Sequence, residues 1–226
     1  MRLPIAPHMS DAASRLRQIL DEIAVSARVA RRAPADVTLI AVSKTRDSAE
    51  IEDLVAAGQR DFGESRVQEA QAKWPPILER NPTVRLHCIG RLQSNKAEEA
   101  VRLFDVIHSV DRPSLVDALI AEARKAGRTP SVYVQVNIGE EEQKGGCVID
   151  EIGDLVAAVR ASPLPLAGLM AIPPLGPEPA PYFALLAELA RRHDVMGLSM
   201  GMSGDFRSAV MLGATAVRVG TALFED

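Results

Sequence analysis

The feature that most constrains this chain is a regular alternation of short apolar runs with segments of helical period. Eight apolar runs occupy residues 37–43, 60–64, 84–90, 104–110, 131–138, 164–170, 194–200 and 214–220. Between them, apolar residues recur at helical spacing, for example at Leu115, Val116, Leu119 and Ile120. Strands that are apolar on both faces and separated by crossover helices favour a parallel sheet covered by helices.

The number of strands then selects the architecture. Eight strand and helix units with no linker-like stretch between them predict an α/β fold, a single closed eight-stranded β/α barrel of the TIM type. An open doubly wound sheet is the alternative, but no GxGxxG follows the first strand to support it. We expect one domain over residues 10–226, starting with a helix at 10–32, and a disordered extension over 1–9.

Charge and cysteine content exclude several classes of protein. The 26 Lys and Arg against 30 Asp and Glu give a net charge of −4, which offers no basic field to a nucleic acid. No apolar run reaches the roughly eighteen residues of a membrane span, and the first residues lack a secretory signal. We therefore expect a cytoplasmic protein that binds neither nucleic acid nor membrane. Cys88 and Cys147 fit reduced thiols rather than a disulfide or a metal site.

A lone lysine follows the first predicted strand. In β/α barrels the chemistry lies at the carboxyl ends of the strands, and Lys44 is placed there by the run VTLIAVS. An amine held in a dry pocket can lose its proton and condense with an aldehyde. We therefore predict a shielded amine that forms a Schiff base. The alternative is a solvated lysine that only marks the end of a strand.

Small residues follow the last two predicted strands, in SMGMSGD (199–205) and VGTALF (219–224). Backbone N–H groups there, with the hydroxyls of Ser203 and Thr221, can surround an anion of phosphate size. Such sites recur after the seventh and eighth strands of this architecture. The alternative is that Ser203 is an ordinary helix cap and Gly220 an ordinary turn glycine.

An arginine lies within the last predicted strand. Arg218 shares one strand face with Ala216 and Gly220, so its guanidinium is predicted to point into the barrel mouth. The alternative is a structural ion pair with a neighbouring carboxylate.

Eight ordered blocks resemble one family, the pyridoxal phosphate homeostasis proteins, also called the proline synthase co-transcribed family. The blocks are AVSKT (41–45), FGESRVQEA (62–70), LHCIGRLQSNK (86–96), IHSVDR (107–112), VNIGEEEQKGG (137–146), GLMAIP (168–173), LSMGMSGDF (198–206) and VRVGTALF (217–224). The resemblance implies a barrel like the N-terminal domain of alanine racemase, with pyridoxal 5′-phosphate (PLP) held as a Schiff base.

The resemblance also implies residue roles. Lys44 would bond the aldehyde, Arg218 would face the pyridine nitrogen, and Lys144 corresponds to a family lysine at the edge of the site that is implicated in cofactor exchange. Ser65 stands where the family usually has an asparagine beside the cofactor. The phosphate would be held by Ser203, Gly220 and Thr221, and Met202 would also contact the cofactor.

Function follows from the same resemblance: a PLP-binding protein that acts in intracellular PLP homeostasis and delivery to apo-enzymes, without clear catalytic activity. A guanidinium beside the ring nitrogen leaves that nitrogen unprotonated and makes the ring a weaker electron sink. The chain ends at Asp226, so we expect no second domain to supply a catalytic base, and a monomer. The alternatives are a PLP-dependent amino-acid racemase and a Schiff-base aldolase without a cofactor.

Overall fold

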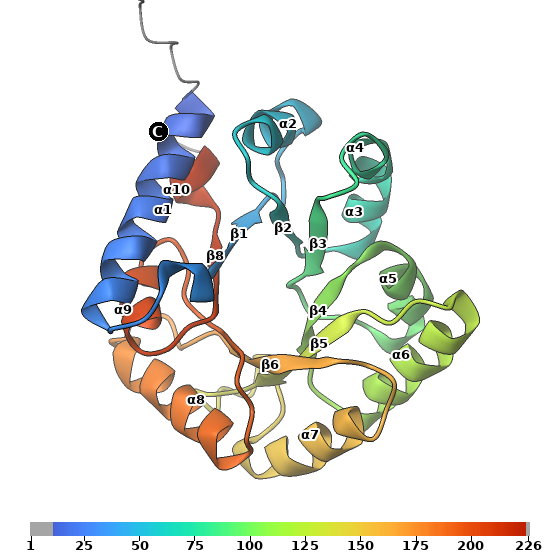
Figure 1. The fold of residues 1–226 in the computed structure, drawn as a ribbon. Helices are drawn as coiled ribbons and strands as arrows, with labels where there is room; N and C mark the ends of the chain where they lie inside the picture. Colours follow the sequence, from blue (N-terminus) through green and yellow to red (C-terminus); the bar gives the residue numbers. More distant parts are fainter. Residues whose placement is uncertain (1–10, 225–226) are drawn as a thin grey trace, which may run out of the picture.

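The eight predicted strands form one closed parallel barrel. The computed structural model describes residues 11–224, and the predicted extension over 1–9 lies outside this range. The strands pair in chain order, and β8 pairs with β1 to close the barrel, with Thr38 opposite Ala216 (Figure 1). The predicted TIM-type barrel is confirmed, and the open-sheet alternative is wrong. The strands are β1 (Thr38–Val42), β2 (Asp61–Glu64), β3 (Arg85–Cys88), β4 (Val106–Val110), β5 (Ser131–Val136), β6 (Leu166–Ala171), β7 (Leu198–Ser199) and β8 (Ala216–Val219).

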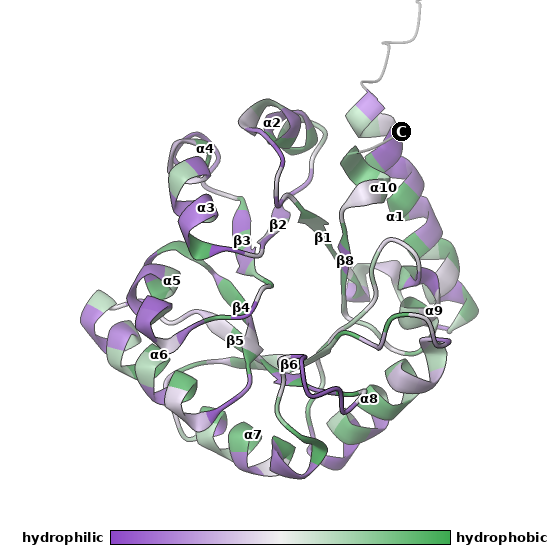
Figure 2. Ribbon diagram, turned by 180° about the vertical axis from the view of Figure 1, so that it is seen from behind, coloured by the Kyte–Doolittle hydropathy of each residue, from purple (hydrophilic) through white to green (hydrophobic). Residues whose placement is uncertain are grey.

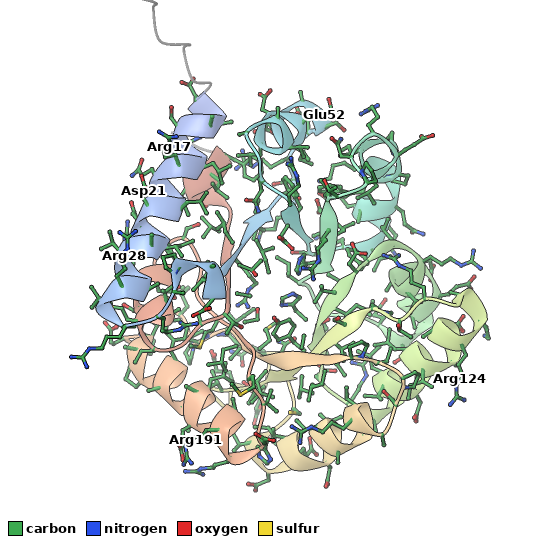
Figure 3. All side chains as sticks on the ribbon, viewed as in Figure 1. Arg17, Asp21, Arg28, Glu52, Arg124 and Arg191 are labelled. Carbon is green, nitrogen blue, oxygen red and sulfur yellow. The ribbon has the colours of Figure 1, made fainter. Side chains whose placement is uncertain are left out.

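Helices surround the barrel, each with an apolar face turned toward it. They are α1 (Asp11–Val29), α2 (Ser48–Ala56), α3 (Val67–Lys73), α4 (Pro75–Arg80), α5 (Ala97–Leu103), α6 (Pro113–Ala126), α7 (Ile152–Arg160), α8 (Ala180–Arg192), α9 (Phe206–Met211) and α10 (Thr221–Phe224). Short 3₁₀ turns lie at Pro34–Asp36, Ser94–Lys96 and Ile149–Glu151. Hydrophobic and hydrophilic residues alternate along the outer helices (Figure 2), and charged side chains such as Arg124 and Arg191 point outward (Figure 3).

Helix α1 fills the ring of helices where the two ends of the described chain meet. It packs against α9 and α10 (Figure 1), and the Arg15 Nε donates to the Leu223 carbonyl oxygen at 2.9 Å. Leu16, Ile19 and Ile23 are buried on its inner face. No helix within residues 11–224 has the length and apolar character needed to cross a bilayer.

One strand is shorter than the sequence predicts, and the helical segment after β2 is interrupted. Strand β7 covers only Leu198–Ser199, and Asp194, at the start of the predicted run, has a left-handed backbone with φ of 53° that a strand does not adopt. The helix after β2 is divided into α3 and α4 at Trp74, because the following Pro75 has no N–H to continue the ladder. Trp74 is fully buried with its ring centroid 5.2 Å from that of Phe62, so it packs in the core.

The barrel interior is more polar than the apolar strands suggest. A large hydrophobic core includes residues of both the strands and the surrounding helices, whereas Val106, Tyr133 and Met170 form a separate small cluster. His108 and Ser199, from β4 and β7, are fully buried and contact one another. The expectation that the strands are apolar on both faces is therefore wrong for part of the interior.

Candidate functional site

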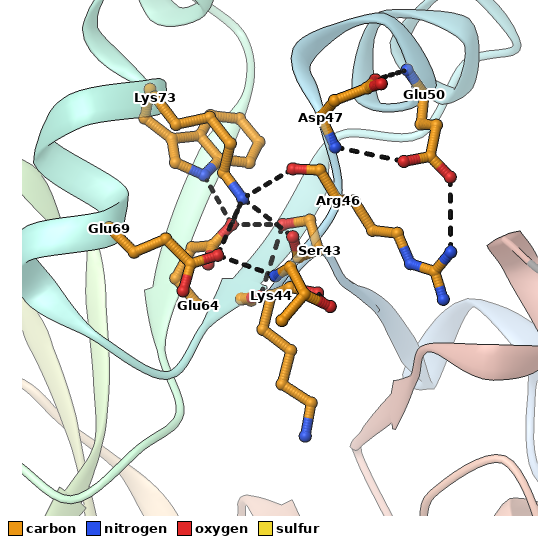
Figure 4. A network of polar contacts seen from close by, with 11 residues as sticks. Ser43, Lys44, Arg46, Asp47, Glu50, Glu64, Glu69 and Lys73 are labelled. Carbon is orange, nitrogen blue, oxygen red and sulfur yellow. Dashed lines mark hydrogen bonds and ion pairs between the residues drawn. The ribbon is translucent and has the colours of Figure 1, made fainter.

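Lys44 lies beyond the carboxyl end of β1, as predicted, but it is not shielded. Its side chain is exposed, and Figure 4 shows it extending away from the polar network beside it. Within residues 11–224 its amine has no hydrogen-bond or ion-pair partner. The predicted dry environment is therefore wrong for this structure, while the predicted position is correct. An unpartnered amine is free to react with an incoming carbonyl.

A second lysine holds the turn that carries Lys44. The Lys73 Nζ, from the end of α3, donates to the carbonyl oxygens of Ser43 at 2.8 Å and Arg46 at 3.2 Å (Figure 4). The backbone of Thr45 between them is left-handed, with φ of 64°. Such a conformation is unfavourable for a β-branched residue and persists only where its surroundings impose it. Lys73 thus fixes the path of the backbone on both sides of Lys44.

Two carboxylates hold Lys73 in place. Its Nζ lies 2.8 Å from Glu64 Oε1 and 3.4 Å from Glu69 Oε1. Glu69 Oε1 also accepts from the Thr45 N–H at 2.7 Å. This backbone hydrogen bond is the largest effect on the pKa of Glu69; burial opposes it, and the charge of Lys73 and its hydrogen bond act in the same direction as the Thr45 N–H, so the pKa lies below its ordinary value of 4.5. The turn is therefore fixed by ionic hydrogen bonds at neutral pH.

Glu64 is the buried centre of this network. It is fully buried at the end of β2, and its Oε1 accepts from Ser43 Oγ at 2.7 Å and Trp74 Nε1 at 2.9 Å. Its Oε2 has no hydrogen-bond partner among the described residues. A buried carboxylate requires compensation of its charge, which Lys73 provides at a side-chain exposure of 10%. We call Glu64, Glu69 and Lys73 the β1-end clamp.

The segment after β7 meets the start of α10. The Gly220 N–H donates to Ser203 Oγ at 3.2 Å, which brings the two predicted anion-binding segments into direct contact. The Met202 N–H is already used by the Asp205 carboxylate at 2.6 Å. The N–H groups of Ser203 and Gly204 donate to no acceptor among the described residues. These amides and the nearby hydroxyls are the donors that a phosphate oxygen requires.

Arg218 is buried beside this cup. It is 4% exposed, and its guanidinium donates to Ser199 Oγ and to the Ala171 carbonyl oxygen at 3.0 Å. No carboxylate within residues 11–224 forms an ion pair with it, so the alternative of a structural ion pair is wrong, and Arg218 lines the pocket at the barrel mouth as predicted. Burial lowers the pKa of Arg218 to about 10, partly opposed by the charge of Asp205, so the group stays cationic at neutral pH.

One pocket collects most of the predicted residues. It has a volume of about 410 Å³ and opens at the carboxyl ends of β1 and β8. Lys144 does not line it: the Lys144 Nζ donates to the Pro173 carbonyl oxygen at 3.0 Å and pairs with Glu141 at 2.6 Å. The predicted residues that line the pocket are Lys44, Ser65, Met202, Ser203, Arg218, Gly220 and Thr221, joined by Val42, Thr45, Arg46, Ile89, Ile172 and Gly204.

The sequence reasoning missed the β1-end clamp. Lys73 and Glu69 are separated by four residues on α3, a spacing that signals an ion pair on one helix face but gives no hint of a contact with the turn after β1. Another hollow, of about 530 Å³, runs along α1 beside Arg207 and contains no lysine for Schiff-base chemistry. Within residues 11–224 no cluster of His, Cys, Asp and Glu could hold a metal ion.

The fold and the site define a parallel β/α barrel whose mouth holds an unpartnered lysine beyond β1 and the free backbone amides of Ser203 and Gly204. Residues 20–226 match the family described as alanine racemase, N-terminal domain. The pyridoxal phosphate homeostasis protein of Pseudomonas aeruginosa is 41% identical over 96% of this chain and 96% of its own length. The Escherichia coli K12 protein of the same name is 39% identical over 96% and 97%.

This chain is also similar to a solved structure. PipY of Synechococcus elongatus PCC7942, solved with PLP bound, superposes with a TM-score of 0.82 at 39% identity, and the match covers 95% of this chain and all of PipY. The chain therefore belongs to the alanine racemase N-terminal domain family and, within it, to the pyridoxal phosphate homeostasis proteins.

Proposed function

We propose that this chain binds PLP reversibly at Lys44 as a Schiff base and takes part in intracellular PLP homeostasis. One observation carries the proposal: an unpartnered lysine amine shares a pocket with a phosphate-sized cup and a buried arginine that has no carboxylate partner. The names of the relatives and the PLP bound to PipY support it.

The pocket residues fit the chemical groups of PLP. The cofactor supplies an aldehyde that condenses with a primary amine, a phosphate dianion and a pyridine nitrogen that accepts a hydrogen bond. Lys44 would supply the amine, and Ser203 and Thr221 would hold the phosphate with the free backbone amides of Ser203 and Gly204. Arg218, which carries only donors, would face the ring nitrogen.

The same residues support binding rather than catalysis. A guanidinium that keeps its proton leaves the ring nitrogen unprotonated, which weakens the ring as an acceptor of electrons from a carbanion. Neither described tyrosine lines the pocket, and Tyr133 is buried in the barrel interior. The protein would then hold the aldehyde in a form that limits its side reactions and release it to apo-enzymes. We further propose that it does so as a cytoplasmic monomer.

Replacing Lys44 tests the assignment. The purified protein loaded with PLP should show a visible absorption band, and borohydride reduction followed by peptide mapping should place the label on Lys44. Lys44→Ala should lose both signals, because no other lysine lines the pocket. Lys125→Ala, which removes a lysine from an exposed pair with Glu122 outside the pocket, is the matched control and should keep both. An undiminished band in Lys44→Ala would refute the assignment.

Two further measurements separate the alternatives. Exchange of the α-proton of an amino acid in deuterated water, catalysed by the loaded protein, would identify an amino-acid racemase instead. A colourless protein that gains no band with PLP but condenses with a sugar phosphate would identify an aldolase. We expect neither result.

A further inference from the structure

A continuous series of polar side chains crosses the barrel interior. It runs from the pocket, at the carboxyl ends of the strands, to the start of β2 at the other end of the barrel. Arg218 on β8 contacts Ser199 Oγ on β7, and the same oxygen lies 2.9 Å from His108 Nδ1 on β4. His108 Nε2 lies 3.0 Å from His87 Nδ1 on β3. His87 Nε2 lies 2.9 Å from Asp61 Oδ1 at the start of β2. We call these five residues the relay.

The chemistry of the pocket end fixes the direction of the first bonds. A guanidinium has no acceptor, so Arg218 donates and Ser199 Oγ accepts. The Ser199 hydroxyl has one proton, and donating it to His108 Nδ1 uses that proton in a hydrogen bond. His108 must then carry its own proton on Nε2, because a neutral imidazole has one donor and one acceptor.

The same rule fixes the remaining bonds. His108 Nε2–H donates to His87 Nδ1, so His87 also carries its proton on Nε2. His87 Nε2–H then donates to the Asp61 carboxylate, which accepts only. Arg85, 3.7 Å from the same Asp61 oxygen, supports a charged carboxylate at this end. Every contact in the relay is satisfied with both histidines neutral.

The opposite direction is less favourable. If His108 donated from Nδ1 to Ser199, the Ser199 oxygen would accept two hydrogen bonds. The Ser199 hydroxyl proton would then have no acceptor among the five residues. His87 would then donate from Nδ1 and present a bare Nε2 to the Asp61 carboxylate, so that two acceptors face each other at 2.9 Å. Avoiding this contact would require a second proton on His87, a buried charge that costs free energy.

The surroundings of His108 favour its neutral form. The ring is fully buried and stacks on Tyr133, with centroids 4.4 Å apart and planes 19° apart. Burial, followed by the proximity of His87 and Arg218, holds the pKa of His108 well below 6.5. A neutral ring beside a cationic arginine avoids a repulsion between two positive charges in the interior.

We infer that His108 and His87 are positioning residues for Arg218. They keep the Ser199 hydroxyl proton directed toward His108 Nδ1. The Ser199 oxygen then serves only as an acceptor for the Arg218 guanidinium. The Asp61 carboxylate at the far end makes this direction favourable, because it only accepts hydrogen bonds. The consequence for PLP binding rests on the proposed function, whereas the proton arrangement does not.

The histidine tautomers test the relay without any cofactor. Two-dimensional ¹H–¹⁵N NMR of the imidazole groups in the PLP-free protein should show His87 and His108 both neutral and both protonated on Nε2. Asp61→Asn replaces a carboxylate that only accepts by an amide that can also donate, so the signals of both rings should shift toward a mixture of tautomers. A wild-type spectrum with either ring protonated on Nδ1 would overturn the inference.

Substitution of His108 tests the positioning role. His108→Phe keeps a ring that can stack on Tyr133 but removes both hydrogen bonds, whereas His108→Gln keeps one acceptor and one donor. In the PLP-free protein we expect the guanidinium protons of Arg218 to exchange with water about tenfold faster in His108→Phe, the change that matches one lost buried hydrogen bond. His108→Gln should restore slow exchange. Equal exchange in all three proteins would overturn the positioning role.

Binding of PLP separates this inference from the proposed function. The dissociation constant for PLP should rise about tenfold in His108→Phe and return toward the wild-type value in His108→Gln. His193→Gln, which replaces a histidine outside the relay, should bind like the wild type. Failure of the wild-type protein to bind PLP would contradict the proposed function, while the tautomers and the Arg218 exchange would still decide the relay.

Discussion

Lys73 is the residue whose loss should most disturb the turn that carries Lys44. Lys73→Met would leave the fully buried Glu64 carboxylate without its cation, a change that typically costs about 3–5 kcal/mol. We expect a correspondingly lower free energy of unfolding in urea and weaker labelling of Lys44 by PLP. Lys125→Met, which removes a lysine from an exposed pair with Glu122, is the control and should unfold like the wild type. Equal stability of the two variants would contradict the clamp.

The two cysteines are predicted to be chemically unreactive in the folded protein. Burial raises the pKa of both Cys88 and Cys147 to about 12, and both side chains are buried. Only the thiolate reacts with disulfide reagents, so both cysteines should be unreactive toward a chromogenic disulfide in the native protein at neutral pH. Both should react rapidly once the chain is unfolded in guanidinium. Fast reaction of either thiol in the native protein would contradict their burial.

At the scale of single elements, the segment after β7 depends on one glycine. Gly201 has φ of 94°, and a Cβ there would lie 2.5 Å from Ala209 Cβ. Its carbonyl oxygen also accepts from the Arg218 N–H at 2.9 Å. Gly201→Ala should therefore strain this segment by about 1–3 kcal/mol and displace Ser203 from Gly220.

The neighbouring Gly204 provides a matched control, because a Cβ there meets nothing within 4 Å. Gly204→Ala should keep the wild-type melting temperature, whereas Gly201→Ala should lower both the melting temperature and the affinity for PLP. Thermal melts of both variants and a PLP titration of Gly201→Ala measure these effects. If Gly201→Ala bound PLP as tightly as the wild type, the cup would not depend on this conformation.

The helices and strands also show which parts of the fold could be predicted from the sequence. Strand existence and helix faces follow from local periodicity, so all eight strands and the first helix were predictable. The two-residue length of β7 was not, because it depends on a left-handed turn at Asp194 and on a close approach of Gly197 to β6, where a Cβ would lie 1.8 Å from the Ala167 carbonyl oxygen. A glycine in a sequence does not reveal which backbone it approaches.

For the whole molecule, the limit of prediction is set by contacts across the barrel. Lys44, Ser203 and Arg218 could be assigned to one mouth because the carboxyl ends of parallel strands share one end of a barrel. The series from His87 to Ser199 could not, since it depends on which side chains meet across the interior after the barrel closes. The exposure of Lys44 was missed for the same reason: burial is a property of the assembled mouth rather than of a strand end.

The buried His108 predicts how the stability of the whole fold depends on pH. Its pKa in the folded state is held well below 6.5, mainly by burial, and the groups that face it are His87, Arg218, Tyr133 and Ser199. In the unfolded chain the same imidazole binds a proton near its ordinary pKa of about 6.5. The unfolded state therefore binds more protons below that pH, so stability is fully present above about pH 6.5 and decreases as the pH falls toward the folded-state pKa.

Urea unfolding measured between about pH 8 and pH 5 should show this decrease, and His108→Gln, which has no ring to protonate, should make the curve flatter. Glu69 does not account for the same window, because its pKa is lowered from 4.5 and its contribution is lost only at more acidic pH. His193→Gln, at a half-exposed position after α8, should keep the wild-type slope. A wild-type slope in His108→Gln would mean that another group titrates in this window and that the barrel interior tolerates a protonated His108.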